Sequence, residues 1–171
     1  MTKHWKPLVA LAAIAWAATP AHAETLELAS PDGKITVTVK DDGGQATYAV
    51  AFEGQQVIAP SKLGMLFAEH HGFERGLAIA GSNRASKDQT WEQPWGERRF
   101  VRDHYNELRA TFVEKDHDKR RFDMVFRVFD DGVGFRYDVP AQPKLAEAQI
   151  VQELTEFAIA RPATAWWIPA Y

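Results

Sequence analysis

The strongest constraint on the fold is a repeating pattern between residues 122 and 139. Every second residue is apolar from Phe122 to Val128, and again from Val133 to Val139. Asp130-Asp131-Gly132 separates the two runs and is typical of a tight hairpin turn. Successive side chains of a strand point to opposite faces, so this pattern predicts two antiparallel strands with a shared apolar face. The residues expected in the core are Phe122, Phe126, Phe135 and Tyr137.

Similar alternation recurs elsewhere in shorter stretches. Ile35 to Lys40 alternates cleanly and lies between turn sequences rich in Asp and Gly. Further strands are predicted near residues 46–52, 65–67, 108–112 and 153–159. Many short strands separated by such turns indicate an all-β fold, an antiparallel β-sandwich or barrel.

Two stretches lack a clear strand pattern. Residues 70–102 are rich in Gly, Ser, Asn and charged side chains, which predicts long loops with short strands. Residues 144–152 have room for about two helical turns at most. No long segment has a helical period.

Residues 1–23 have the pattern of an export signal. A short positive region precedes an apolar stretch at residues 8–18, and Ala21-His22-Ala23 supplies a cleavage site. We expect cleavage after Ala23, a mature domain of residues 24–171, and a periplasmic or secreted protein. The apolar stretch is shorter than the roughly 20 residues of a membrane helix, so no membrane association is predicted.

The chain contains no cysteine, and its formal net charge is −3. Stability must therefore come from burial of apolar side chains rather than from disulfides. Thiolate metal sites and a cysteine nucleophile are excluded. Because nucleic acids and anionic membranes are bound through basic faces, neither is expected as a partner.

Local geometry supports no catalytic or metal site. Asp130-Asp131 is explained by the hairpin turn, and Glu153 and Glu156 are expected on opposite faces of a strand, where they cannot converge on one bond. Asp116-x-Asp118 lacks the Gly and Glu that complete a calcium loop. His70-His71 has no further histidine at ligand spacing. We assign no catalytic residue and no metal ligand to this chain.

Four tryptophans are candidates for contact with a sugar: Trp91, Trp95, Trp166 and Trp167. An indole face can cover the apolar C–H face of a pyranose, and its N–H can donate a hydrogen bond. Burial in a core or interface would explain the same residues, because tryptophan is highly buried on average. The apolar ending around Trp166-Trp167 predicts a surface covered either by polypeptide downstream of Tyr171 or by a ligand.

Seven short strings follow one another in a recognisable order. They are Ser30 to Lys34, Pro60 to Gly64, Trp91 to Glu97, Asp103 to Leu108, Phe126 to Tyr137, Glu153 to Phe157 and Trp166 to Tyr171. Together they resemble the amino-terminal domain of glycoside hydrolase family 97, over essentially all of residues 24–171. The string from Phe126 to Tyr137 is the most specific.

The resemblance implies a part of a larger enzyme. Family members are exported α-glucosidases or α-galactosidases with an amino-terminal β-supersandwich, a central (β/α)8 barrel and a carboxy-terminal β domain. Their catalytic carboxylates belong to the barrel, and calcium in the active site assists the chemistry. The resemblance implies that this chain is truncated before the barrel, frames the substrate and is inactive alone. Its expected partners are an α-linked glucoside or galactoside and the missing barrel, and no calcium is expected to bind this fragment alone.

Two other functions fit the same sequence. A free-standing carbohydrate-binding β-sandwich module would suit the tryptophans, and a structural or adhesive exported sandwich would suit the fold. The coding sequence after Tyr171 distinguishes them: an open frame with alternating strand and helix patterns favours the enzyme, and a stop favours the others.

Overall fold

The structure, a computed structural model, describes residues 24–164 and 166–168. The predicted export signal lies outside the described residues. Within these residues the chain forms strands and no helix. The described residues therefore include no helix that could cross a membrane. The strands are β1 (Thr25–Ala29), β2 (Ile35–Asp42), β3 (Gln45–Phe52), β4 (Gln55–Lys62), β5 (Met65–Phe67), β6 (Leu77–Glu92), β7 (Phe100–Glu114), β8 (Arg121–Phe129), β9 (Val133–Asp138) and β10 (Ile150–Glu153).

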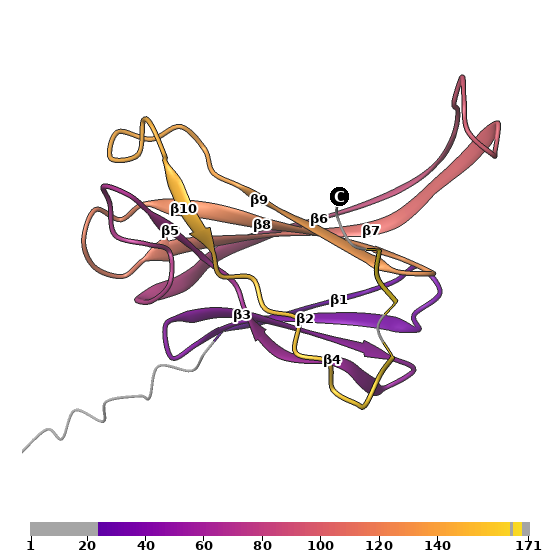
Figure 1. The fold of residues 1–171 in the computed structure, drawn as a ribbon, viewed down its shortest axis with the longest axis horizontal. Coiled ribbons are helices and arrows are strands. Elements are labelled where there is room, and N and C mark those ends of the chain that lie inside the picture. Colours follow the sequence, from indigo (N-terminus) through magenta and orange to yellow (C-terminus); the bar gives the residue numbers. More distant parts are fainter. Residues whose placement is uncertain (1–23, 165, 169–171) are drawn as a thin grey trace, which may run out of the picture.

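Two antiparallel sheets form the layers of a sandwich (Figure 1). One has the order β1-β2-β3-β4, and the other has the order β6-β7-β8-β9. β10 and β5 form a third, two-stranded sheet. Sheets built from consecutive hairpins need only short connections, which fits the closely spaced turns of the sequence. The prediction of an all-β antiparallel sandwich is confirmed.

The first sheet is held in register by two tight turns. Asp42 pairs with Gln45 across Gly43 and Gly44, whose φ angles are 59° and 88°. Phe52 pairs with Gln55 across Glu53 and Gly54, with φ angles of 48° and 75°. Two-residue turns with positive φ at both positions match the right-handed twist of the strands that they join.

The hairpin predicted from residues 122–139 is confirmed in the second sheet. Val128 pairs with Val133, and the Phe129 amide donates to the Gly132 carbonyl oxygen at 2.8 Å. Phe122 and Phe126 are fully buried. Phe135 and Tyr137 share their face but are only half-buried, because β9 is an edge strand of its sheet.

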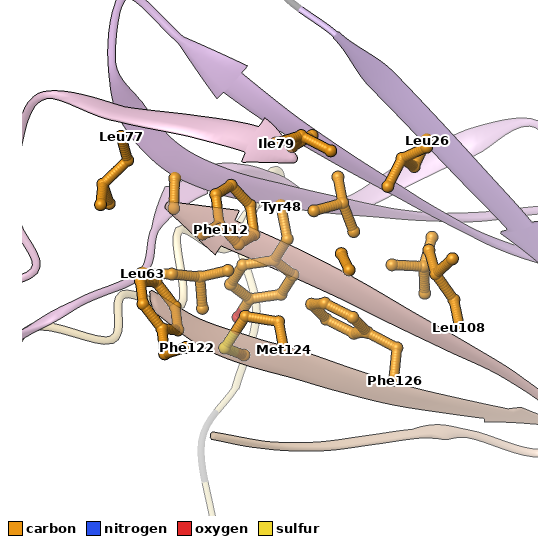
Figure 2. Close-up of a cluster of buried hydrophobic side chains, with 14 of the residues drawn as sticks. Leu26, Tyr48, Leu63, Leu77, Ile79, Leu108, Phe112, Phe122, Met124 and Phe126 are labelled. Atoms are coloured by element: carbon orange, nitrogen blue, oxygen red, sulfur yellow. The ribbon is translucent and has the colours of Figure 1, made fainter. Parts of the chain in front are cut away.

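The core lies between the two sheets (Figure 2). Phe122 stacks with Phe112 at 5.4 Å between ring centroids and with Phe73 at 4.8 Å. Tyr48, from the first sheet, contacts Phe126, from the second, at 5.9 Å. Aromatic pairs at such separations add to the free energy gained by burying their surface.

Two predictions for the less regular stretches are wrong. Most of residues 70–102 is not loop: it holds all of β6 and the first residues of β7, the two longest strands, paired from Leu77↔Glu114 to Glu92↔Phe100. The strand predicted near 108–112 is confirmed as part of β7. Residues 144–152 contain no helix and lead into β10. The strand predicted near 153–159 is shifted, since β10 ends at Glu153 and an irregular segment follows it.

This irregular segment runs along the free edge of β4. We call residues 154–164 and 166–168 the exit segment. The Glu156 amide donates to the Lys62 carbonyl at 3.0 Å, and the Ala160 amide donates to the Val57 carbonyl at 3.0 Å. Between them, the Ala59 amide donates to the Ala158 carbonyl at 2.8 Å. The exit segment therefore occupies backbone groups that an edge strand otherwise leaves open.

Two tyrosine hydroxyls fix the start of the exit segment. Tyr48 donates to the Glu156 carbonyl at 2.9 Å, and burial raises the pKa of Tyr48 to about 12. The Tyr137 hydroxyl lies 2.8 Å from Thr155 Oγ1 and accepts from the Gly64 amide at 2.9 Å, and burial also raises its pKa. Both hydroxyls thus stay protonated near neutral pH and tie the segment to both sheets.

Candidate functional site

A two-stranded arm extends beyond the sandwich. β8 pairs with β7 only as far as Tyr105↔Phe129. Beyond that pair β6 and β7 continue alone, from Asp88↔His104 to Glu92↔Phe100. Figure 1 shows this part, residues 88–104, projecting away from both layers. We call it the arm, and it has no sheet beneath it to supply a core.

Ion pairs between the two strands stabilise the arm and its base. Arg102 donates to both carboxylate oxygens of Asp88, at 2.8 and 2.7 Å. Lys87 Nζ lies 3.0 Å from Asp103 Oδ2 at the base. The hydrogen bond from Arg102 holds the pKa of Asp88 below its usual value. Bidentate arginine–carboxylate pairs fix geometry as well as charge, so this pair supports the register between the two strands of the arm.

The tip of the arm presents aromatic side chains to solvent. Trp95 is 82% exposed and Trp91 is 43% exposed. The Gln93 amide closes the tip by donating to the Arg99 carbonyl at 3.0 Å, and the Gln93 side chain donates to the Arg98 carbonyl. Gly96 lies against the Gln93 side chain, where a Cβ at position 96 would be 2.9 Å from Gln93 Nε2. The φ angle of Gly96, 116°, also favours glycine.

One carboxylate near the base of the arm links the turns of the two large sheets. Asp130 Oδ1, in the β8–β9 turn, accepts a hydrogen bond from the Asp32 amide of the first sheet at 2.9 Å. Its Oδ2 lies 3.5 Å from His104 Nδ1 on β7, a buried nitrogen that has no hydrogen-bond partner among the described residues. Asp130 is thus more than a turn residue. Sequence reasoning missed this role, because its partners lie far away in the chain.

The four candidate tryptophans fall into two pairs on different elements. Trp91 and Trp95 lie on the arm, while Trp166 and Trp167 belong to the exit segment and are 93% and 77% exposed. Among the described residues, none of the aromatic ring contacts involves these four side chains. They are therefore available for a ligand or for another polypeptide surface.

The carboxylates considered from the sequence make separate contacts. Glu153 accepts from the Thr155 hydroxyl, whereas Glu156 pairs with Lys62 Nζ at 3.3 Å. The amide of Lys62 also donates to Glu156 and lowers the pKa of that carboxyl.

A further pair, Asp123 and Asp138, lies on opposed positions of β8 and β9. Arg109 Nη1 donates to both carboxylates, at 2.7 and 2.8 Å. In a glycosidase the scissile bond lies between the two catalytic carboxyl groups. Here the Arg109 guanidinium occupies that space between Asp123 and Asp138.

No group of three or more acidic or histidine side chains within residues 24–164 and 166–168 is placed to hold a metal ion. Calcium takes about six to eight oxygen ligands, and the described residues gather no such group of acidic side chains. The His71 ring instead stacks on that of His117, at 4.4 Å and 22° between ring planes. Nearly parallel rings do not direct their in-plane lone pairs at one ion.

The sequence pattern described as Glycosyl-hydrolase 97 N-terminal matches residues 28–171. The chain belongs to glycoside hydrolase family 97. It is 29% identical over 110 residues to a retaining α-galactosidase of Bacteroides thetaiotaomicron, covering 64% of this chain and 16% of that protein. A probable retaining α-galactosidase of Streptomyces bingchenggensis is 29% identical over 162 residues, covering 91% of this chain and 24% of that protein.

Solved structures agree with this family assignment. A family 97 enzyme from a Pseudoalteromonas species, in complex with panose, superposes with a TM-score of 0.80 at 40% identity. The same species' enzyme in complex with acarbose gives a TM-score of 0.81. The match covers 85% of this chain but 22% of those enzymes. A β-arabinopyranosidase, with a TM-score of 0.72 and 24% identity, shares the fold. The chain thus spans about a fifth of the length of the family 97 enzymes that it matches.

Proposed function

We propose that this chain is the substrate-framing, amino-terminal domain of an exported, calcium-dependent α-glycosidase that hydrolyses α-glucosides or α-galactosides. It is inactive alone, and the catalytic carboxylates and the calcium site belong to a central barrel outside this chain. The observation that carries the proposal is the family match over residues 28–171. The names of the relatives and the panose and acarbose complexes support an α-linked substrate.

The carboxylates of the described residues fit this division of labour. Glycoside hydrolysis uses two carboxyl groups held about 5 to 10 Å apart across the bond. Here Glu114 pairs with Arg120, Glu107 pairs with Arg127, and Asp123 and Asp138 share Arg109. Carboxylates engaged in this way stabilise the sheet and are poorly placed to donate a proton to a leaving group.

Activity measurements test the proposal directly. This chain is compared with a version continued through its downstream coding sequence, on nitrophenyl α-glucoside and α-galactoside, with calcium and with a chelator. The long chain is expected to be active with calcium and to lose activity with the chelator, while the short chain is inactive. Activity of the short chain would contradict the proposal, and inactivity of the long chain on every α-glycoside would favour a free-standing carbohydrate-binding module.

Export is tested by mass spectrometry, which should show a mature amino terminus at Glu24 rather than Met1.

The arm is the part of this domain that we assign to framing the sugar. Trp95→Ala in the active long chain is expected to raise KM several-fold, roughly two- to tenfold, and to leave kcat unchanged, because an exposed indole face binds ground state and transition state alike. Ile150→Ala, an exposed apolar change on β10, is the control and should leave both constants unchanged. An unchanged KM for Trp95→Ala would exclude contact between this residue and the sugar.

A further inference from the structure

An open apolar groove lies beside the exit segment, between the first sheet and β9. It has a volume of about 430 Å³. Its walls include Tyr48, Phe52, Val57, Val133, Phe135 and Phe157. A second hollow shares Phe52 and Val57 and continues along the exit segment to Ile159 and Ala163. The two hollows therefore form one continuous surface, which we call the edge groove.

The chemistry of the larger hollow of the edge groove does not suit a sugar. Tyr48 is the one residue lining the larger hollow that has a polar side chain, and its hydroxyl already donates to the Glu156 carbonyl at 2.9 Å. Sugar hydroxyls buried there would lose water without gaining partners, which costs free energy for each unpaired group. The occupant of the larger hollow must instead offer aliphatic or aromatic side chains, whereas Gln55, Gln56 and Arg161 give the smaller hollow a polar margin.

The position of the edge groove indicates which polypeptide is in reach. Phe157, in the exit segment, forms one wall, and Ala163 lines the far end. Trp166 follows three positions later, and Trp166, Trp167 and Ile168 are all at least 77% exposed. The groove is thus followed in the chain by exposed apolar side chains at the end of the exit segment. Apolar surfaces of this kind mark sites of interaction.

We propose that the edge groove is the docking surface for the polypeptide that follows this domain in the longer family 97 enzyme, with Trp166 and Trp167 as part of the same contact. This inference rests on the proposed function. The matched enzymes contain much more polypeptide than this chain, which covers 22% of them. A segment tethered at the exit segment has a high effective concentration at the groove, whereas a free partner has no such advantage.

Thiol labelling tests the docking surface, because the chain has no cysteine of its own. Val57→Cys places one thiol in the groove, where Val57 is 45% exposed. Val151→Cys, on β10 and outside the groove, is the matched control. Modification is followed by mass spectrometry of the labelled peptide, in this chain and in the chain continued through its downstream coding sequence. In the long chain, labelling of Val57→Cys is expected to slow by at least about tenfold, while Val151→Cys keeps its rate.

The other occupants give different results. If Val57→Cys is protected in the short chain, and if this protection increases with protein concentration, the occupant is a second copy of the chain. That result overturns the proposal. Protection only after an α-linked oligosaccharide is added identifies a sugar, and equal labelling in both chains shows that the groove stays open. A stop codon directly after Tyr171 also overturns it.

A second variant separates docking from folding. Val57→Arg is expected to lower the unfolding temperature of the long chain but not of the short one, and Val151→Arg to lower neither. The α-glycosidase assay is read independently of both experiments. An active long chain with an open groove refutes the docking surface alone, whereas a protected groove in a long chain inactive on α-glycosides refutes the proposed function alone.

Discussion

Glu114→Ala is expected to lower the free energy of unfolding by about 3 to 5 kcal/mol, because it leaves a buried guanidinium without its counter-charge. The side chains of Arg120 and Glu114 are 1% and 3% exposed. Arg120 Nη2 and Nε donate to the two carboxylate oxygens of Glu114 at 2.6 and 3.0 Å. The guanidinium also lies 5.1 Å from the ring centroid of Phe73 and donates to the His71 carbonyl at 2.7 Å.

Denaturant titration of two further variants identifies the cause of the loss. The double variant Glu114→Leu/Arg120→Met removes both charges and should recover most of the stability, since an apolar pair of similar volume has no desolvated charge. Glu92→Ala breaks the ion pair with Arg99 on the arm, where the side chains are 55% and 72% exposed. That change should cost about 1 kcal/mol or less. A similarly small loss for Glu114→Ala would show that the pair is solvated.

Phe126→Ala should also cost about 3 to 5 kcal/mol, through lost burial and the cavity left behind. Its side chain has no exposed surface, and its ring lies 5.9 Å from that of Tyr48 and 5.4 Å from that of Phe135. Because Tyr48 and Phe126 come from facing sheets, the cavity would separate the two layers where they touch.

Phe100→Ala is the matched control for Phe126→Ala. It makes the same chemical change on the arm, where the side chain is 59% exposed, and should alter stability by about 0.5 kcal/mol or less. Both variants are compared with the parent chain by denaturant titration. The three curves are fitted with one common m-value, the slope of the unfolding free energy against denaturant concentration. A loss below about 1 kcal/mol for Phe126→Ala would contradict full burial.

The sandwich was predictable where each strand has one buried and one solvated face. Ile35 to Lys40 and Phe122 to Val128 alternate for this reason, and the turn at Asp130-Asp131-Gly132 follows from local chemistry. The arm was missed because it has no layer on either side, so its strands show no alternation between a buried and a solvated face. The exit segment was misplaced because its hydrogen bonds with β4 are irregular.

The candidate site was predictable by residue type but not by position. The exposed tryptophans were identified from chemistry, yet only the structure divides them between the arm and the exit segment. The hydrogen bond from the Asp32 amide to Asp130 joins residues distant in sequence. The burial of Arg120 had no local signal, because charged residues are mostly exposed and the pairing with Glu114 depends on the β7–β8 turn.

The closure of β4 by the exit segment has a consequence for where this domain can be cut. A version ending before Leu154 would lose the backbone partners of Val57, Ala59 and Lys62 and uncover a strand with apolar side chains along it. Such an edge is a template for pairing with other chains, and therefore for aggregation. The sandwich can look complete at Asp138, where its last large-sheet strand ends. Its protection against self-association, however, depends on residues that belong to neither large sheet.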